Sequence, residues 1–277
     1  MRPGEFAKSH GLGNDYIVVD GDSFGIALTP ERVRLLCHRN LGLGGDGVLE
    51  VSSRKDGFFV RVWNPDGSEA ERSGNGLRIA AKFLSEHGYT SADRYAISTV
   101  AGPVAVEVIR DAGTRVLAAR LEMGRAQIDR ATRELVVDGT RLDVTLVSVG
   151  NPHCVIFGQP FTRERLYDLG PRVEKHPRFP ARTNVQLAEP VTRSRVRALI
   201  WERGAGHTLA SGTSACAVAA ACAHRGLAEG RVEVDMEGGA LEIEVSRDLD
   251  LVMKGPVEAV YTGEISSGLR DRLAALP

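Results

Sequence analysis

Apolar and polar residues alternate along several short stretches of the chain, which is the pattern of half-buried β-strands. The alternation is clearest at 104–109 (VAVEVI) and 241–245 (LEIEV). Other stretches rich in β-branched residues lie at 17–20, 58–63, 142–148, 196–201 and 232–236. We predict a strand in each of these stretches.

Two further stretches carry apolar residues on nearly every side of a helix, and such helices are buried. The first runs from about residue 75 to 86 and is followed by Gly88, and the second runs from about 213 to 224 and is followed by Gly226. Glycine just beyond the last turn is a common helix stop. The remaining segment, 263–277, is expected to form a C-terminal helix.

The chain repeats itself at a distance of 137 or 138 residues. Recurring strand and turn patterns could produce any single match, but five matches in order favour a duplicated domain. We therefore expect an α/β protein of the α+β type with two pseudo-symmetric domains, each a mostly antiparallel sheet wrapped around a central helix. The expected halves are 1–117, with 263–277 packing back on it, and 118–262. The matching stretches are 13–19 with 150–156, 47–49 with 184–186, 62–63 with 200–201, 73–74 with 211–212 and 102–108 with 239–245.

Composition narrows the possible partners. The 277 residues carry a formal net charge of -1 and only 5% aromatic residues, which argues against a nucleic-acid partner. No apolar run approaches the ~18 residues needed to cross a bilayer, and no apolar leader opens the chain. The four cysteines form no CxxC pair and suit a reducing compartment. We expect a cytoplasmic protein with no membrane contact.

Both predicted buried helices begin with Ser-Gly, at Ser73-Gly74 and at Ser211-Gly212. A helix N-terminus leaves N–H groups unpaired and attracts anions, and glycine lets a ligand approach the backbone. Serine is also an ordinary N-cap residue. Because the two sites match across the repeat, we favour a shared site for a carboxylate.

Other polar residues lie at strand ends and turns near these helices. Arg203 follows Glu202 at the end of a predicted strand, and its guanidinium could hold a carboxylate with two hydrogen bonds; a solvated ion pair is the alternative. His153, as a lone histidine, is more often structural than catalytic. The asparagines in such positions are Asn14, Asn64, Asn75, Asn151 and Asn184.

Seven short motifs occur together in this chain: HGLGND at 10–15, GLGGDG at 42–47, WNPDGS at 63–68, GNG at 74–76, GNPH at 150–153, TNV at 183–185 and ERGAG at 202–206. In order and spacing they resemble the diaminopimelate epimerase family over essentially the whole chain. The resemblance implies two α/β domains with the substrate site between them, no cofactor, pyridoxal phosphate included, and no metal. It also implies a homodimer.

The activity that the resemblance implies is an isomerase that converts LL- to meso-diaminopimelate on the route to lysine and cell-wall precursors. In the family, one cysteine removes the α-proton and a second returns a proton on the opposite face. Carried over by position, Ser73 and Ser211 stand in these two places, and His153 and Glu202 lie beside them. The implied substrate contacts are Asn14, Asn64, Gly74, Asn75, Asn151, Asn184, Arg203, Gly212 and Thr213.

The serines are a departure from the family, and so are His207, where glutamate is frequent, and Ser214, where glycine is common. A free thiol has a pKa of about 8.5, and a hydroxyl is far less acidic. A serine base therefore needs a neighbouring general base. His153 is the candidate for Ser73, and Glu202 or His207 is the candidate for Ser211.

Three interpretations of the serine pair stay open. We favour a natural homologue that isomerises diaminopimelate or another amino acid, or that removes water from a hydroxy amino acid with a single base. The second interpretation is an epimerase whose two cysteines have been replaced by serine, which leaves His207 and Ser214 unexplained. The third is a non-catalytic protein that binds an amino acid.

Overall fold

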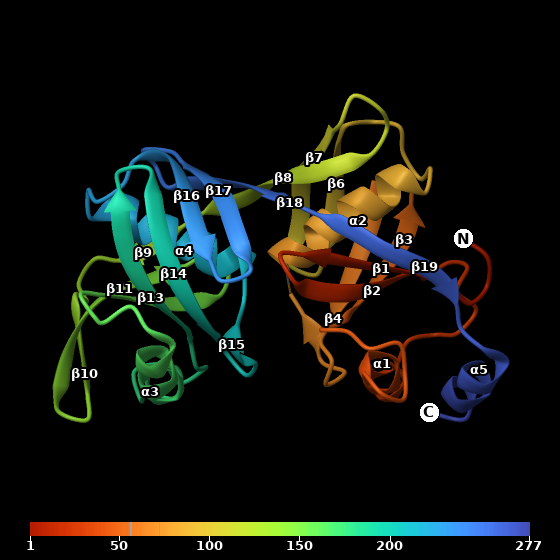
Figure 1. The fold of residues 1–277 in the computed structure, drawn as a ribbon, viewed down its shortest axis with the longest axis horizontal. Helices are drawn as coiled ribbons and strands as arrows, with labels where there is room; N and C mark the ends of the chain where they lie inside the picture. The colour runs from red at the N-terminus through yellow and green to blue at the C-terminus, as the bar shows by residue number, and fades with distance from the viewer. Residues whose placement is uncertain (56, 72) are drawn as a thin grey trace. The chain divides into compact units, whose positions relative to one another are not determined.

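The computed structural model describes residues 1–55, 57–71 and 73–277, and the chain divides into two compact units (Figure 1). Unit 1 comprises Met1–Leu121 and Gly255–Pro277, and unit 2 comprises Glu122–Lys254. The chain passes between the units inside two strands, β8 (Val116–Arg125) and β18 (Asp250–Pro256). The sequence pattern placed these passages after residues 117 and 262 instead, because it offers no boundary signal inside a continuous strand.

Unit 1 is a mostly antiparallel sheet that surrounds the helix α2 (Gly74–Glu86). Its strands pair in the order β19–β1–β2–β3–β4–β6–β7–β8. The short strand β5 pairs with the end of β4 that β6 does not contact. Among the described pairings of this unit, only β2–β3 and β4–β6 are parallel. The other elements are β1 (Glu5–Gly11), β2 (Asn14–Asp20), α1 (Pro30–Cys37), β3 (Val48–Arg54), β4 (Gly57–Trp63), β5 (Glu69–Ala70), β6 (Arg94–Thr99), β7 (Gly102–Arg110), β19 (Glu258–Glu264) and α5 (Ser267–Ala274).

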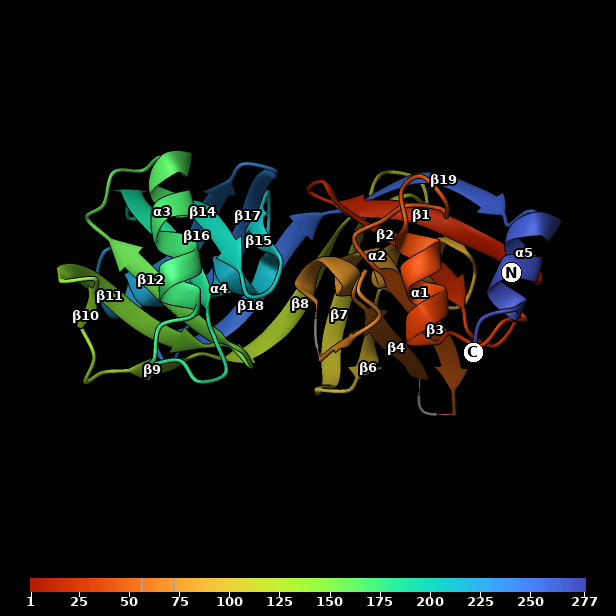
Figure 2. The same cartoon turned by 90° about the horizontal axis from the view of Figure 1, so that it is seen from below.

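Unit 2 has the same plan around α4 (Gly212–His224). Its strands pair in the order β10–β11–β12–β13–β14–β16–β17–β18, with β9 on β11 and β15 on β14, and β12–β13 and β14–β16 are parallel. Figure 2 shows α3 (Arg163–Glu174) outside the strands that surround α4. The remaining strands are β9 (Gln127–Asp129), β10 (Glu134–Val137), β11 (Thr140–Ser148), β12 (Pro152–Phe157), β13 (Asn184–Thr192), β14 (Arg195–Glu202), β15 (Gly206–Thr208), β16 (Gly230–Met236) and β17 (Gly239–Val245).

The sequence repeat is also a repeat of strand register. The pair Ile17↔Val48 between β2 and β3 recurs as Cys154↔Val185 between β12 and β13. Farther along, Thr99↔Gly102 recurs as Met236↔Gly239. The two units therefore share one architecture, which confirms the predicted fold class.

All seven predicted strands and both predicted buried helices are present, with ends extended by a few residues. The expected C-terminal helix is present as α5, which begins at Ser267, and residues 263 and 264 of the same segment complete β19. Helix α2 is buried as predicted, but it also buries Arg78 and Lys82, whose charges an apolar pattern does not account for. The other strands, which include the ten-residue β8 and the nine-residue β13, and the helices α1 and α3 were not predicted.

The C-terminal segment contributes to the core of unit 1. Ile265 and Leu273 are 4% and 0% exposed, and they join a hydrophobic cluster with Phe6, Ile17 and Leu36. In unit 2, one face of α3 packs in the same way into a cluster on the sheet. No helix in the described ranges is long and apolar enough to span a membrane.

Candidate active site

Ser73 is the N-cap residue of α2, in an extended conformation with φ -130° and ψ 119°. Its Oγ accepts a hydrogen bond from the N–H of Gly76 at 3.0 Å, and the hydroxyl of Tyr16 lies 3.3 Å from the same oxygen. The cap satisfies one of the unpaired N–H groups of the first turn. The half-buried hydroxyl of Ser73 is therefore fixed at the positive end of a helix.

The start of α2 is linked to two loops by a chain of amide hydrogen bonds. Asn75 Nδ2 donates to Asn14 Oδ1 at 3.1 Å, and Asn14 Nδ2 donates to Asp46 Oδ2 at 3.0 Å. Burial, with repulsion from Asp15 as a smaller cause, raises the pKa of Asp46. On the helix side, Arg78 Nη2 donates to Asn75 Oδ1 at 2.9 Å. The structure thus brings Asn14 and Asn75 together as one polar group.

Asn64 has a different environment from these two asparagines. Its Nδ2 donates to Ser68 Oγ at 2.9 Å, and its backbone N–H donates to the carbonyl of Ser68 at 2.8 Å. These bonds close the turn that follows β4. The expected substrate contact at Asn64 stays a prediction.

Ser211 occupies the matching position in unit 2, as the N-cap of α4 with φ -144° and ψ 125°. Its Oγ accepts a hydrogen bond from the N–H of Ser214 at 3.4 Å, and the residue is only 4% exposed. Gly212 and Thr213, which form the first turn, are buried as well. Ser211 therefore repeats the cap of Ser73 in a more enclosed environment.

His153 is buried within unit 2 and hydrogen-bonded on both ring nitrogens. Gln186 Nε2 lies 3.0 Å from Nδ1 and can only donate, so Nε2–H of the ring donates to Asn151 Oδ1 at 2.8 Å. Burial lowers the pKa of His153 to about 3, so the ring is neutral near pH 7. Both ring nitrogens are therefore occupied by Asn151 and Gln186 within unit 2, and the expected role of His153 as the base for Ser73 stays a prediction.

Asn184 and Arg203 are joined at the ends of β13 and β14. Asn184 Nδ2 donates to the carbonyl of Pro152 at 3.0 Å, and its Oδ1 accepts from the N–H of Arg203 at 2.9 Å. The guanidinium of Arg203 is exposed and donates to the carbonyl of Ala181 at 3.1 Å. Glu202 is the last residue of β14, directly before this arginine.

His207 is held by residues other than Ser211. Its Nε2 forms a short contact with Glu237 Oε2, and its Nδ1 lies 3.3 Å from the hydroxyl of Tyr167. Arg163 pairs with the same Glu237. The structure therefore places the ring of His207 in a surface ion-pair cluster, which does not support its expected role as the base for Ser211.

The four cysteines of the chain lie away from the protein surface. Cys37, Cys154, Cys216 and Cys222 are all buried. Burial raises the pKa of Cys37, Cys154 and Cys222 to about 12. A protonated, buried thiol is a poor group for proton transfer.

The described hydrogen bonds define what the two serines can do. Ser73 contacts Tyr16 and a backbone N–H, and Ser211 contacts a backbone N–H. The backbone N–H donors stabilise negative charge on an oxygen atom, but they cannot accept the proton that a hydroxyl must lose. The Tyr16 hydroxyl can be donor or acceptor toward Ser73. Within the described ranges, no group of three or more His, Cys, Asp or Glu side chains is arranged to hold a metal ion.

Three residues of this region were not predicted as site residues: Tyr16, Asp46 and Gln186. Gln186 had a usable signal, because it is a polar residue in the apolar stretch 184–188 (NVQLA) and is 0% exposed. Asp46 lies within one of the quoted motifs. Tyr16 gave no signal, since its contact with Ser73 joins residues 57 positions apart.

Comparison with known proteins gives a consistent result. The sequence profile of the family described as diaminopimelate epimerase matches residues 6–128 and 145–260. The chain is 39% identical to diaminopimelate epimerase 2 from a Nostoc species, over 95% of this chain and 96% of that protein. It is 40% identical to diaminopimelate epimerase from Pelotomaculum thermopropionicum, over 94% and 98%.

A solved structure supports the fold. A hydroxyproline epimerase from Agrobacterium vitis superposes with a TM-score of 0.72 at 14% sequence identity, covering 94% of this chain and 90% of that one. At this identity the likeness concerns the fold alone.

Proposed function

Because the chain belongs to the diaminopimelate epimerase family, we propose that it is a cofactor-independent epimerase with Ser73 and Ser211 in the two proton-transfer positions. The observation that carries the proposal is the equivalence of these serines. Each caps the buried central helix of its unit and accepts a hydrogen bond from the N–H three residues later. The same hydroxyl geometry therefore occurs twice in one chain.

The proposed reaction inverts the α-carbon of an amino acid. One serine takes the α-proton from one face, and the other delivers a proton to the opposite face. The N–H groups of Gly74, Asn75, Gly212 and Thr213 hold the reacting carboxylate at the two helix N-termini. Since His153 has a pKa of about 3 and no vacant nitrogen, Glu202 is the better candidate for accepting a serine proton.

The proposed substrate is diaminopimelate, converted from the LL to the meso form. Asn64, Asn184 and Arg203 match the family positions that hold the non-reacting end of this substrate. The exposed guanidinium of Arg203 and the ordered amide of Asn184 support that assignment. A homodimer stays a prediction that rests on the family resemblance, and a cytoplasmic location stays a prediction that rests on the sequence composition.

The alternative is an amino-acid-binding protein without activity. It is favoured by the hydrogen bonds of the two serines, whose described partners are donors or a phenol rather than a base. In this case the polar groups would bind the amino acid, but the α-proton would stay in place.

Proton exchange separates these two functions. LL-diaminopimelate is incubated with the protein in deuterated water, and the α-proton is followed by NMR. Loss of the α-proton signal together with appearance of the meso form is the expected result. Exchange without inversion would indicate a single working base. Thermal stabilisation by the ligand without any exchange would establish the binding protein instead.

The double variant Ser73→Cys, Ser211→Cys is the complementary experiment. A thiol at a helix N-terminus is far more acidic than a hydroxyl, so we expect epimerisation to rise by at least about tenfold. The matched control is Ser214→Cys, which adds a thiol in the first turn of α4 outside the two base positions. If the double variant stays inactive on diaminopimelate but exchanges the α-proton of another amino acid, the substrate assignment is wrong.

A further inference from the structure

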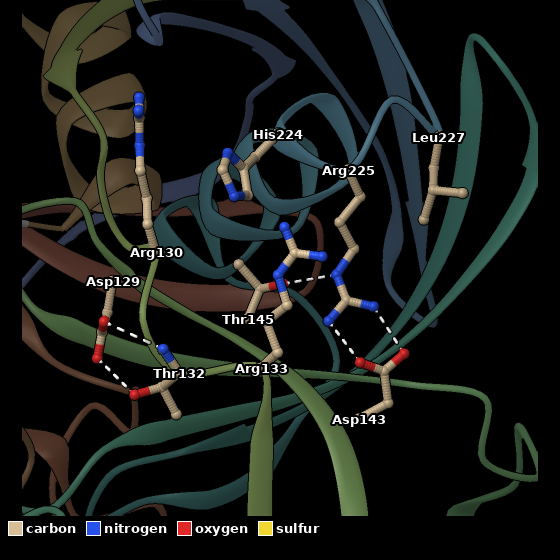
Figure 3. Close-up of a pocket in the computed structure, with 9 residues that line it drawn as sticks. All are labelled: Asp129, Arg130, Thr132, Arg133, Asp143, Thr145, His224, Arg225 and Leu227. Atoms are coloured by element: carbon tan, nitrogen blue, oxygen red, sulfur yellow. Dashed lines mark hydrogen bonds and ion pairs between the residues drawn. The ribbon is translucent and has the colours of Figure 1, made fainter.

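Unit 2 contains a pocket of about 430 Å³ at the C-terminal end of α4. It is bounded by the segment between β9 and β10, by the first half of β11 and by the end of α4 (Figure 3). Ser211 caps the other end of this 13-residue helix. At 1.5 Å per residue the pocket is about 20 Å from the Ser211 hydroxyl, so it is separate from the proposed proton-transfer positions.

Both acidic residues of the pocket already have partners. Asp129 accepts hydrogen bonds from the N–H of Ala131 at 3.0 Å and from Thr132 Oγ1 at 2.8 Å, and it pairs with Arg178 at 3.1 Å. Asp143 accepts hydrogen bonds from both terminal nitrogens of Arg225, each at 2.7 Å. The negative charges of the pocket are therefore compensated, that of Asp143 by Arg225 in the pocket and that of Asp129 by Arg178 outside it.

Arg225 forms a rigid wall of the pocket. Besides binding Asp143, its Nε donates to Thr145 Oγ1 at 2.7 Å, and one terminal nitrogen also donates to the carbonyl of Val144. Its guanidinium lies 4.2 Å from the ring centre of Phe157. All these contacts fix the side chain before any ligand arrives, which lowers the entropic cost of binding.

Three cationic or titratable side chains remain for a ligand: Arg130, Arg133 and His224. The two arginines are exposed, and within the described ranges neither guanidinium has an ion-pair or hydrogen-bond partner. In Figure 3 the side chain of Arg133 extends toward His224, whereas Arg130 points away from the Asp143–Arg225 pair. Burial lowers the pKa of His224, and the positive charges of Arg130, Arg133 and Arg225 lower it further. His224 therefore lies in a region of positive potential to which these three arginines contribute.

We propose that this pocket binds a small polyanion, such as a phosphate ester or a polycarboxylate, through Arg130, Arg133 and His224. Guanidinium groups match phosphate and carboxylate oxygens with paired hydrogen bonds. The volume exceeds that of a single inorganic ion and suits a metabolite-sized ligand. The site is additional to the proposed epimerase function and does not depend on it.

The experiment measures binding of pyrophosphate and of citrate to the full chain by isothermal titration calorimetry, with NMR of the His224 ring as a second readout. The variants are Arg130→Gln and Arg133→Gln, and the matched control is Arg247→Gln, another exposed arginine of unit 2 that does not line the pocket. We expect each pocket variant to bind about tenfold more weakly, since a charge-assisted hydrogen bond is lost, and the control to bind like the original chain.

Two results would overturn the proposal: no binding of either probe, or equal binding by all variants. Binding of pyrophosphate alone would identify the ligand as a phosphate compound, and binding of citrate alone would identify it as a carboxylate. Both of these results support the site. The readout is binding, so a protein that fails to epimerise any amino acid can still pass this test.

Discussion

The imidazole of His153 is 1% exposed and has hydrogen-bond partners on both nitrogens. Burial of a charged imidazolium is costly, which is why the pKa falls to about 3. The same enclosure that makes this histidine a poor proton acceptor makes it a good structural link. Through Gln186 it connects to Ser214 in the first turn of α4, where Gln186 Nε2 donates to Ser214 Oγ at 3.0 Å.

A pH-dependent loss of stability follows from this residue. In the unfolded chain a histidine has a pKa of about 6.5, so between pH 6.5 and 3 the unfolded chain binds a proton that the folded chain does not. We expect the free energy of unfolding to fall in this range by up to about 1.4 kcal/mol per pH unit from His153. Urea unfolding at several pH values measures the slope.

The control for this slope uses two histidine variants. His153→Gln should remove the contribution of the buried ring from the slope, and His10→Gln, a variant of a partly exposed ring on β1, provides the comparison. An unchanged slope in His153→Gln would mean that the buried ring is protonated in the folded protein.

Among the secondary-structure elements, α2 is unusual because a buried helix carries two buried cationic side chains. Arg78 donates to the carbonyl of Pro256 at 3.2 Å and to Asn75 Oδ1 at 2.9 Å. Lys82 donates to Glu86 and to the carbonyl of Val116, both at 2.7 Å. These contacts join the helix to the strands where the chain leaves and re-enters unit 1. The charges are tolerated because they have partners.

Removing the Arg78 guanidinium should therefore destabilise the protein strongly. Arg78→Ala leaves buried acceptors without their donors, and we expect a loss of about 3 kcal/mol or more in the free energy of unfolding. The matched control, Arg94→Ala, removes a side chain that is 78% exposed and should change stability by less than about 1 kcal/mol. Equal effects in urea unfolding would contradict the structural role of Arg78.

At the scale of secondary-structure elements, the sequence predicts best where the periodicity of apolar residues is strong. Long alternating stretches such as 104–109 and the apolar helices were predicted because their pattern is local. The helix α1 was missed although it has clear local signals, an N-cap at Thr29 and proline in its first turn. Contacts such as Tyr16 with Ser73 and Asn14 with Asp46 could not be predicted, because they depend on which strands pair. The motif resemblance identified candidate site residues, whereas the contacts of those residues depend on strand pairing and are visible only in the structure.

On the scale of the whole molecule, unit 1 is discontinuous in sequence and unit 2 is continuous. The returning segment closes unit 1, since β19 pairs with β1 and Leu273 of α5 is 0% exposed. Removing or weakening this returning segment should therefore destabilise unit 1 more than unit 2.

Leu273→Ala tests this asymmetry. Truncation of a fully buried leucine costs about 2–5 kcal/mol, and we expect faster amide hydrogen exchange in unit 1 with little change in unit 2. The control, Leu209→Ala, truncates a leucine that is 46% exposed and should leave exchange in both units nearly unchanged. Equal acceleration in both units by Leu273→Ala would show that they unfold as one.

The register repeat also shows where the two halves of the chain differ in length. The step between equivalent residues is 137 at Val48 and Val185 but 138 at Trp63 and Trp201. The added residue coincides with the bulge between Pro190 and Thr192, near the tip of the β13–β14 hairpin. From the tryptophans to Ser73 and Ser211 the spacing is ten residues in both halves. The tip of the hairpin has therefore tolerated an insertion. The ten-residue spacing between each tryptophan and its serine has not changed, so both hydroxyls stand at equivalent positions.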